Sequence, residues 1–293
     1  MSTETTAGHG HGHGHDTDLD WEAMADNLEA YGELSLPALR STATRLGSLI
    51  DSPTRIFDVG SGPGVMTSVL AEAFPAAEVI AIDPTPALLE RALARGKRLG
   101  HPISVREGEL PDLDDGRLGT ADVIWSSKAV HHLGDQQAAL TELASVLRPG
   151  GLLAVAEAGL PMRYLPRDLG FGRPGFQARL DAVQETWFTA MRAELPGSVS
   201  VVEDWPSMLT TAGLTSVGSF STLLDLPAPL SDVGRTYLHG HLTRHQDVMS
   251  ESLDEDDRET LAVLLAPDSP EGILSRPDAF LLTATTVYTG RKP

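Results

Sequence analysis

The most informative stretch of the chain is RIFDVGSGPG, residues 55–64. A short β-branched and aromatic run leads directly into three glycines, and an apolar, helix-forming run follows at 65–74. Glycine lets the backbone turn sharply and come close to a ligand. A helix that begins there offers free N–H groups and the positive end of its dipole. The stretch therefore predicts a strand, a turn and a helix that bind an anionic group, either a pyrophosphate or the carboxylate of an amino-acid cofactor.

Predicted strands and helices alternate on the carboxyl-terminal side of this stretch. Short apolar runs predict strands, and apolar residues spaced three and four apart predict helices. The predicted strands are 55–59, 78–82, 103–105, 121–126 and 152–157. Such alternation is typical of an α/β fold with a parallel sheet and helices on both faces. We therefore predict a Rossmann-like core over residues 54–159.

The second predicted strand is followed by Asp83, which can accept hydrogen bonds from both hydroxyls of a ribose. This combination fits a nicotinamide enzyme as well as a methyltransferase. A dinucleotide-binding fingerprint places its third glycine three residues after the second, and that position holds Val65. The glycine spacing therefore favours the methyltransferase.

Several segments, in the right order, resemble the class I S-adenosylmethionine-dependent methyltransferases, in the branch that acts on small molecules. The matching segments are residues 58–64, Asp83, 108–110, 121–126, 130–133 and 147–151. The resemblance implies a seven-stranded, mostly parallel sheet whose last strand runs antiparallel beside the fifth. It also implies S-adenosyl-L-methionine as the cofactor and S-adenosyl-L-homocysteine as the product.

The resemblance further implies which residues hold the cofactor. Asp83 would bind the ribose, and Ser126 would lie near the methionine portion. Glu109 would meet the adenine amine, although the family more often has aspartate there, and Leu110 would pack against the ring. The complete implied set is Asp58, Gly60, Gly62, Gly64, Asp83, Pro84, Glu109, Leu110 and Ser126.

Two adjacent histidines follow the fourth predicted strand, near the place where substrate meets cofactor in this family. Free histidine titrates near ~6.5, so either could take a proton at neutral pH. We prefer His132 to His131 because the family places the histidine before leucine nearest the acceptor; packing or helix capping is the alternative. Tyr31 and Glu157 are further catalytic candidates, and Asp135 is interpreted as a helix cap.

The two ends of the chain match the family less distinctly. Residues 1–17 are predicted to be a disordered His/Gly-rich tail, and residues 18–53 form helices that cover the site. Residues 160–293 hold a helical lid, two last strands at 214–224 and 280–288, and a helical insertion at 226–277. The insertion either completes the acceptor pocket or mediates a homodimer. Its acidic run, 254–259, is expected to face solvent.

Composition excludes several classes of function. The chain of 293 residues has no cysteine, which excludes disulfides and thiolate catalysis. A net charge of −19 repels nucleic acid and anionic membranes. No apolar run approaches the ~20 residues that cross a bilayer, so we expect a soluble, cytoplasmic protein. His239, His241 and His245 are expected on the surface, and no metal site is predicted.

We therefore expect a small-molecule acceptor, methylated at carbon, nitrogen or oxygen. Aromatic residues in the predicted lid favour an aromatic or indole-like natural-product intermediate. These aromatic residues are Trp21, Tyr31, Tyr164, Trp187 and Phe188. Two alternatives stay open: an NAD(P)-dependent oxidoreductase, and a protein that binds S-adenosylmethionine without turnover.

Overall fold

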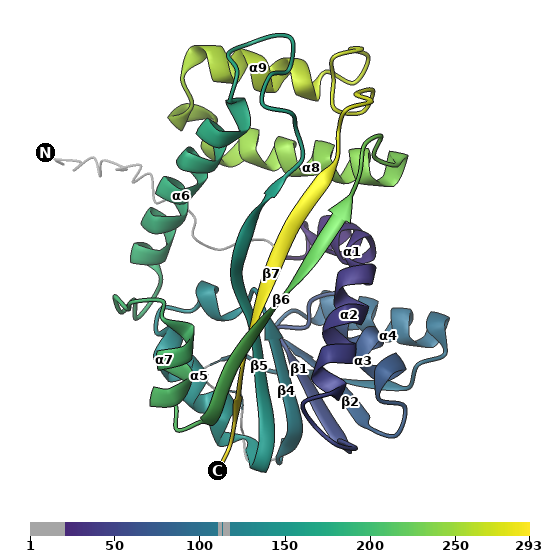
Figure 1. Ribbon diagram of the computed structural model, residues 1–293, viewed down its shortest axis with the longest axis vertical. Coiled ribbons are helices and arrows are strands. Elements are labelled where there is room, and N and C mark those ends of the chain that lie inside the picture. Colours follow the sequence, from purple (N-terminus) through teal and green to yellow (C-terminus); the bar gives the residue numbers. More distant parts are fainter. Residues whose placement is uncertain (1–20, 111–112, 114–117) are drawn as a thin grey trace, which may run out of the picture.

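The protein forms a seven-stranded sheet with helices on both faces, as a computed structural model shows (Figure 1). The structure describes residues 21–110, 113 and 118–293. The predicted tail, 1–17, lies outside the described residues. The strand order is β3-β2-β1-β4-β5-β7-β6. β7 runs antiparallel between β5 and β6, which confirms the predicted place of the last strand.

The elements follow the predicted alternation up to β5. The strands are β1 Arg55–Val59, β2 Glu78–Asp83, β3 Ile103–Glu107, β4 Ala121–Ser127, β5 Leu147–Arg163, β6 Thr215–Leu226 and β7 Leu281–Arg291. The helices among the described residues are α1 Ala25–Leu34, α2 Leu36–Gly47, α3 Val65–Ala73, α4 Pro86–Leu99, α5 Gln136–Ser145, α6 Phe176–Glu194, α7 Trp205–Thr211, α8 Asp232–Met249 and α9 Glu255–Leu265, with short 3-10 turns η1 Val130–His132 and η2 Ser250–Ser252.

Each face of the sheet buries its own apolar layer. On one face, Phe57, Ile124 and Leu153 pack with residues of α5 and α7. On the other face, Ile56 and Val123 pack with residues of α2 and α3. The central parallel strands are therefore covered on both sides, which is why their sequences are apolar runs rather than alternating ones.

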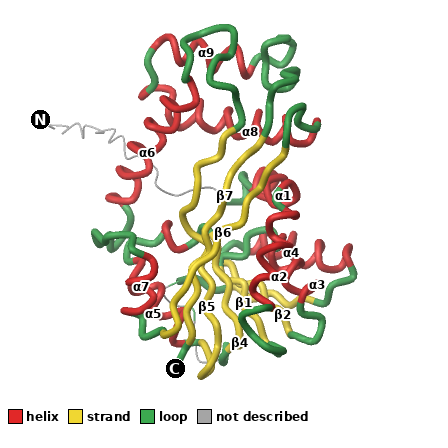
Figure 2. The backbone as a smooth tube through the Cα atoms, in the orientation of Figure 1, coloured by secondary structure: helices red, strands yellow, loops and turns green. Residues whose placement is uncertain are grey.

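β5, β6 and β7 continue as a three-stranded ribbon beyond the rest of the sheet (Figure 2). β5 does not end at Glu157 as predicted but runs on to Arg163, because β7 pairs with it there. Gly159 permits this: a Cβ at that position would lie 2.0 Å from the Ala284 carbonyl oxygen. At the far end of the ribbon, side chains of α6, α8 and α9 form a separate apolar cluster.

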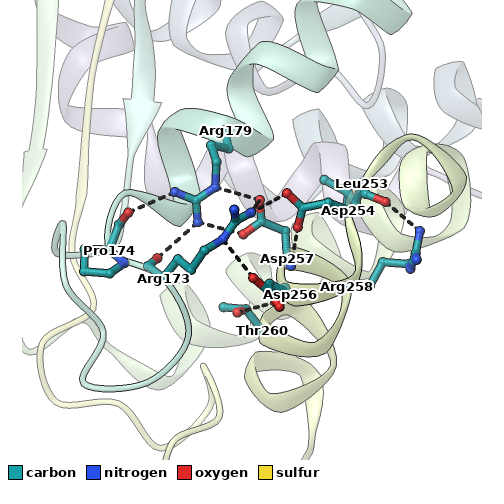
Figure 3. A network of polar contacts seen from close by, with 9 residues as sticks. All are labelled: Arg173, Pro174, Arg179, Leu253, Asp254, Asp256, Asp257, Arg258 and Thr260. Atoms are coloured by element: carbon teal, nitrogen blue, oxygen red, sulfur yellow. Dashed lines mark hydrogen bonds and ion pairs between the residues drawn. The ribbon is translucent and has the colours of Figure 1, made fainter.

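An ion pair between a buried aspartate and a partly exposed arginine joins α9 to α6 (Figure 3). Asp257 is only 2% exposed, and its carboxylate accepts from Nε and Nη2 of Arg179, both at 2.7 Å. Arg173 lies beside it and contacts Asp254 and Asp256. The expectation that the whole acidic run faces solvent is therefore wrong, because arginines outside the insertion draw Asp257 inward.

The expected surface position is wrong for one histidine of α8. His245 is 4% exposed, and its ring meets that of His241 edge-on at 4.4 Å between centroids. Its Nε2 lies 3.1 Å from the Gln184 side-chain oxygen. The i, i+4 spacing thus serves packing between α8 and α6.

No helix in the described part of the chain is both long and apolar enough to span a bilayer.

Replacing Asp257 with alanine is expected to lower the free energy of unfolding by about 1–3 kcal/mol, because Arg179 loses two charge-assisted hydrogen bonds to a buried carboxylate. Urea unfolding of the variant measures the loss. Asp256→Ala is the matched control: its side chain is 62% exposed, and the change there should stay below ~1 kcal/mol. Equal losses in the two variants would contradict the assigned role of Asp257.

Candidate functional site

A cavity of about 1070 Å³ opens at the carboxyl ends of β1, β2 and β4. Its walls include the loop after β1, the end of β2 and the segment after β4, with residues of α1, α2, β6 and β7 on the opposite side. The strand order reverses between β1 and β4: β2 and β3 lie on one side of β1, and β4 and β5 lie on the other. Ligands of open α/β sheets bind at such a point, outside the carboxyl ends of the strands.

The three predicted glycines have two different structural roles. All have positive φ, +72° at Gly60, +54° at Gly62 and +74° at Gly64. A Cβ at Gly60 would lie 2.6 Å from that of Ala129, and one at Gly64 would lie 2.5 Å from that of Ala92. A Cβ at Gly62 would meet nothing within 4 Å. Gly60 and Gly64 are therefore needed for packing, whereas Gly62 leaves space in the cavity wall for a ligand.

Asp83 shapes this loop and also lines the cavity. Its Oδ2 accepts from the backbone N–H of Gly62 at 2.8 Å, and its Oδ1 accepts from that of Thr85 at 2.9 Å. Burial raises the pKa of Asp83, and the hydrogen bonds from Thr85 and Gly62 offset part of the rise. Each carboxylate oxygen keeps a further lone pair for a ligand hydroxyl. Pro84 lies beside it in the wall.

Asp58, at the end of β1, is a buried carboxyl group in the floor of the cavity. It accepts from the Thr67 hydroxyl at 2.6 Å. Burial raises its pKa to about 7; the Thr67 hydrogen bond opposes the rise and the Asp83 charge adds to it. The group therefore keeps its proton to a higher pH than an ordinary aspartate does.

The structure brings most of the remaining predicted cofactor residues to the same cavity. Glu109 is exposed in the wall, and Leu110 beside it is buried. Ser126 is different: its side chain is fully buried on the other face of β4, and Ser127 lines the cavity instead. The strand alternation decides this, because successive side chains point to opposite faces.

Of the predicted catalytic group, Glu157 and His131 lie behind the cavity wall. Glu157 accepts from the backbone N–H groups of Ala129 and Val130 at 3.1 and 3.0 Å, and its Oε2 lies 2.6 Å from Nδ1 of His131. Neither side chain lines the cavity. Glu157 therefore holds the turn that follows β4 in place.

His132 does line the cavity, with its ring 5.0 Å from that of Trp21 and 4.1 Å from that of His131. Burial, with the charges of His131, Arg244 and Arg192, lowers its pKa to about 3. The imidazole is thus neutral at pH 7. It is too weak a base to take up a proton efficiently, because a catalytic base works best when its pKa lies near the working pH. Asp135 caps α5 as predicted, accepting from the N–H of Ala138 at 2.9 Å.

Tyr31 projects from α1 into the cavity and meets Lys128, which sequence reasoning missed. The Lys128 ammonium donates to the Tyr31 hydroxyl at 3.2 Å and lies 4.3 Å from the centre of its ring. Burial raises the pKa of Tyr31, but the Lys128 charge and hydrogen bonds from Lys128 and Ser35 outweigh it, so the pKa falls below its ordinary value. A lysine two residues past Ser126 carries no sequence signal for this contact.

The part of the cavity formed by α1, α2, β6, β7 and Lys128 is here called the acceptor chamber, after the role proposed for it below. It is lined by Leu28, Tyr31, Ser35, Ala38, Leu39, Thr42, Lys128, Thr222, Leu224, Thr283 and Thr285. Trp21 lies in the wall near its mouth, whereas Tyr164 is buried in the far apolar cluster and neither Trp187 nor Phe188 reaches the cavity. Two of the predicted aromatic residues thus reach the cavity wall.

Comparison with known proteins shows matches in this core. Residues 56–151 match the sequence model of a family described as a methyltransferase domain. Trans-aconitate 2-methyltransferase of Methylobacterium radiotolerans is 36% identical over 106 residues, 36% of this chain and 38% of that protein. The enzyme of the same name from Methylobacterium nodulans is 30% identical over 200 residues, 67% of this chain and 69% of that protein.

Three curated relatives, including the Methylobacterium radiotolerans enzyme, are matched over less than half of their length. The chain spans 29–41% of the length of these three. Among solved structures, an O-methyltransferase family protein from Burkholderia thailandensis aligns with a TM-score of 0.51 at 16% identity, covering 95% of this chain and 60% of that chain. This likeness shows the fold.

Asp58 predicts a pH-dependent stability. Because its pKa is raised from 3.8 to about 7, the folded state holds a proton that the unfolded state releases, so stability falls as pH rises from about 4 to about 7. Relative to wild type, Asp58→Asn should gain on the order of 4 kcal/mol of unfolding free energy across this window. Urea unfolding at a series of pH values tests this; Asp51→Asn, on an exposed loop, serves as control. Parallel curves for wild type and Asp58→Asn would contradict it.

Proposed function

Because the chain belongs to the class I S-adenosylmethionine-dependent methyltransferases, we propose that it moves the methyl group of S-adenosyl-L-methionine to a small-molecule acceptor, releasing S-adenosyl-L-homocysteine. One observation carries this proposal. One cavity includes both the acceptor chamber and a part lined by Gly62 and Asp83. The latter part suits a nucleoside that carries an amino-acid tail.

The residues of the first end fit the cofactor. Gly62 leaves open space near the amino-terminal end of α3, where the amino-acid portion of the cofactor would approach. Asp83 would accept from the ribose hydroxyls, Glu109 would meet the adenine amine, and Leu110 supplies an apolar surface for the ring. When bound, the sulfonium supplies an electrophilic methyl group.

The residues of this chain then have to position the two reactants and exclude water. An in-line arrangement held by the protein contributes up to ~7–11 kcal/mol in favourable cases. Leu28 and Tyr31 of α1, with Met191 and Leu195 at the end of α6, form walls that close around the reacting groups. His132 is available as a neutral hydrogen-bonding group, and Glu157 acts on the reaction by holding the turn that carries it.

We propose an aromatic or indole-like acceptor, methylated at carbon, nitrogen or oxygen. Trp21, Tyr31 and His132 offer ring faces and edges, and the hydroxyl groups of the chamber offer hydrogen bonds. The family assignment counts against an oxidoreductase. A protein that binds the cofactor without turnover would show the same binding site but yield no methylated product with any acceptor.

For the insertion 226–277, we propose that it supports the acceptor chamber. Tyr237 of α8 packs against Tyr31 at 5.5 Å between ring centroids, although no side chain of the insertion lines the cavity itself. A homodimer stays a proposal, and sedimentation velocity would decide it.

Calorimetric titration with S-adenosylhomocysteine, NAD and NADP tests the cofactor. We expect S-adenosylhomocysteine to bind and the two nicotinamide cofactors not to bind. Asp83→Ala should weaken the affinity at least ~10-fold, because the ribose loses a charged acceptor. Circular dichroism of the variant checks that it is folded. Binding of NAD or NADP in preference would overturn the proposed function.

Gly62→Ala tests the cradle directly. The variant should lose about 1 kcal/mol of stability because its φ is +54°, and its affinity for S-adenosylhomocysteine should fall ~10-fold or more because the methyl group fills ligand space. Gly100→Ala is the matched control, since it also has positive φ, +73°, and nothing within 4 Å of the added Cβ, but lies outside the cavity. It should lose stability and keep full affinity. Unchanged affinity in Gly62→Ala would refute this placement.

A further inference from the structure

Lys128 is held in an unusual backbone conformation at the edge of the acceptor chamber. Its φ is +53°, in the left-handed region that costs a residue with a Cβ about 1 kcal/mol. Its backbone N–H donates to the Ala156 carbonyl at 3.1 Å, which ties the turn to β5. Strain of this kind persists where the surrounding structure enforces it, and it is concentrated at functional sites. The conformation places the ammonium group in the cavity wall.

The ammonium of Lys128 has unused hydrogen-bonding capacity. It contacts the Tyr31 ring and donates to the Tyr31 hydroxyl, and within the described part of the chain no carboxylate forms an ion pair with it. An ammonium carries three donors, so two remain. The Tyr31 oxygen accepts from Lys128 and keeps its own O–H for another acceptor. Lys128 and Tyr31 thus each keep donor capacity at the place where they meet.

Lys128 is a cation in a cavity whose other charged lining residues, among those described, are carboxylates. The protein carries a net charge of −19, and the described carboxylates that line the cavity, Asp58, Asp83, Glu109 and Asp135, all come from the Rossmann-like core. The lining residues from α1, α2, β6 and β7 include no charged side chain among those described. Lys128 is exposed, and on the chamber side it meets neutral walls, so no carboxylate of the chamber competes with an anion for its ammonium group.

We propose that Lys128 and Tyr31 form an anion site that holds a carboxylate of the acceptor, so that the acceptor is a small carboxylic acid. A carboxylate offers two oxygens, one for the Lys128 ammonium and one for the Tyr31 hydroxyl. The Lys128 charge makes that hydroxyl more acidic and hence a stronger donor. The proposal rests on the proposed function for the identity of the cavity, and it adds the substrate class.

The test is binding to protein saturated with S-adenosylhomocysteine. A panel of aromatic and aliphatic acids is titrated beside the matching amides, for example indole-3-acetate with indole-3-acetamide and benzoate with benzamide. In wild type, at least one acid should bind ~10-fold or more tightly than its amide. Lys128→Met should abolish the preference, Lys128→Arg should keep part of it, and Tyr31→Phe should reduce it by several-fold.

Lys97→Met controls for the change in net charge, because this lysine is exposed on α4 outside the cavity, and it should keep the acid preference. Equal binding of every acid and its amide in wild type, or a preference that survives in Lys128→Met, overturns the inference. Affinity for S-adenosylhomocysteine is measured first in each protein. Its absence in wild type would count against the proposed function, whereas its presence without acid preference would count against the carboxylate site alone.

Discussion

The hydrogen bond from the Gly62 N–H to the Asp83 carboxylate is the contact on which the cofactor end of the cavity depends. The Ile82 carbonyl adds two more, accepting from the N–H groups of Gly60 and Ser61 at 2.8 and 3.1 Å. Together they hold the loop after β1 against the end of β2. The carboxylate that shapes the loop also lies in the cavity wall, so the loop geometry and the proposed contact with the ribose depend on one side chain.

The second half of the cavity exists because β7 lies between β5 and β6 and extends far beyond the parallel strands. One face of this ribbon presents Thr222, Thr283 and Thr285 to α1 and α2 across the acceptor chamber. Its far end carries α6, α8 and α9, which are joined by the Asp257 ion pair and an apolar cluster. The ribbon thus links the insertion to the chamber, although no residue of the insertion, which is described throughout, lines the chamber wall.

The two parts of the cavity also differ in the charges of their lining residues. Carboxylates gather near the glycine loop, where burial raises the pKa of Asp58 and Asp83. On the acceptor side the exposed Lys128 contacts Tyr31, and the other residues of the chamber are hydroxyl-bearing or apolar. His132, the residue that the family pattern favours as a base, has its pKa lowered to about 3 by burial and neighbouring cations. The polar chemistry of the acceptor side therefore centres on Tyr31 and Lys128 rather than on the histidines.

The sequence by itself determined the alternating core and the glycine turn, because these follow from local periodicity and short motifs. The antiparallel last strand was implied by the resemblance to the family and is present in the fold. Asp58 and Asp83 line one cavity, as expected for residues at the carboxyl ends of neighbouring parallel strands, which must meet at one edge of the sheet. Only the tertiary structure decided that Ser127 rather than Ser126 faces the cavity, that β5 continues to Arg163, and that Asp257 and His245 are buried. The length of β5 and the burial of Asp257 and His245 depend on partners far away in the chain, such as β7, Arg179 and Gln184, whereas the orientation of Ser127 depends on which face of β4 the cavity occupies. The contact between Tyr31 and Lys128 is of the same kind: 97 residues separate the two, and the backbone conformation that brings the ammonium to the ring leaves no mark in the sequence.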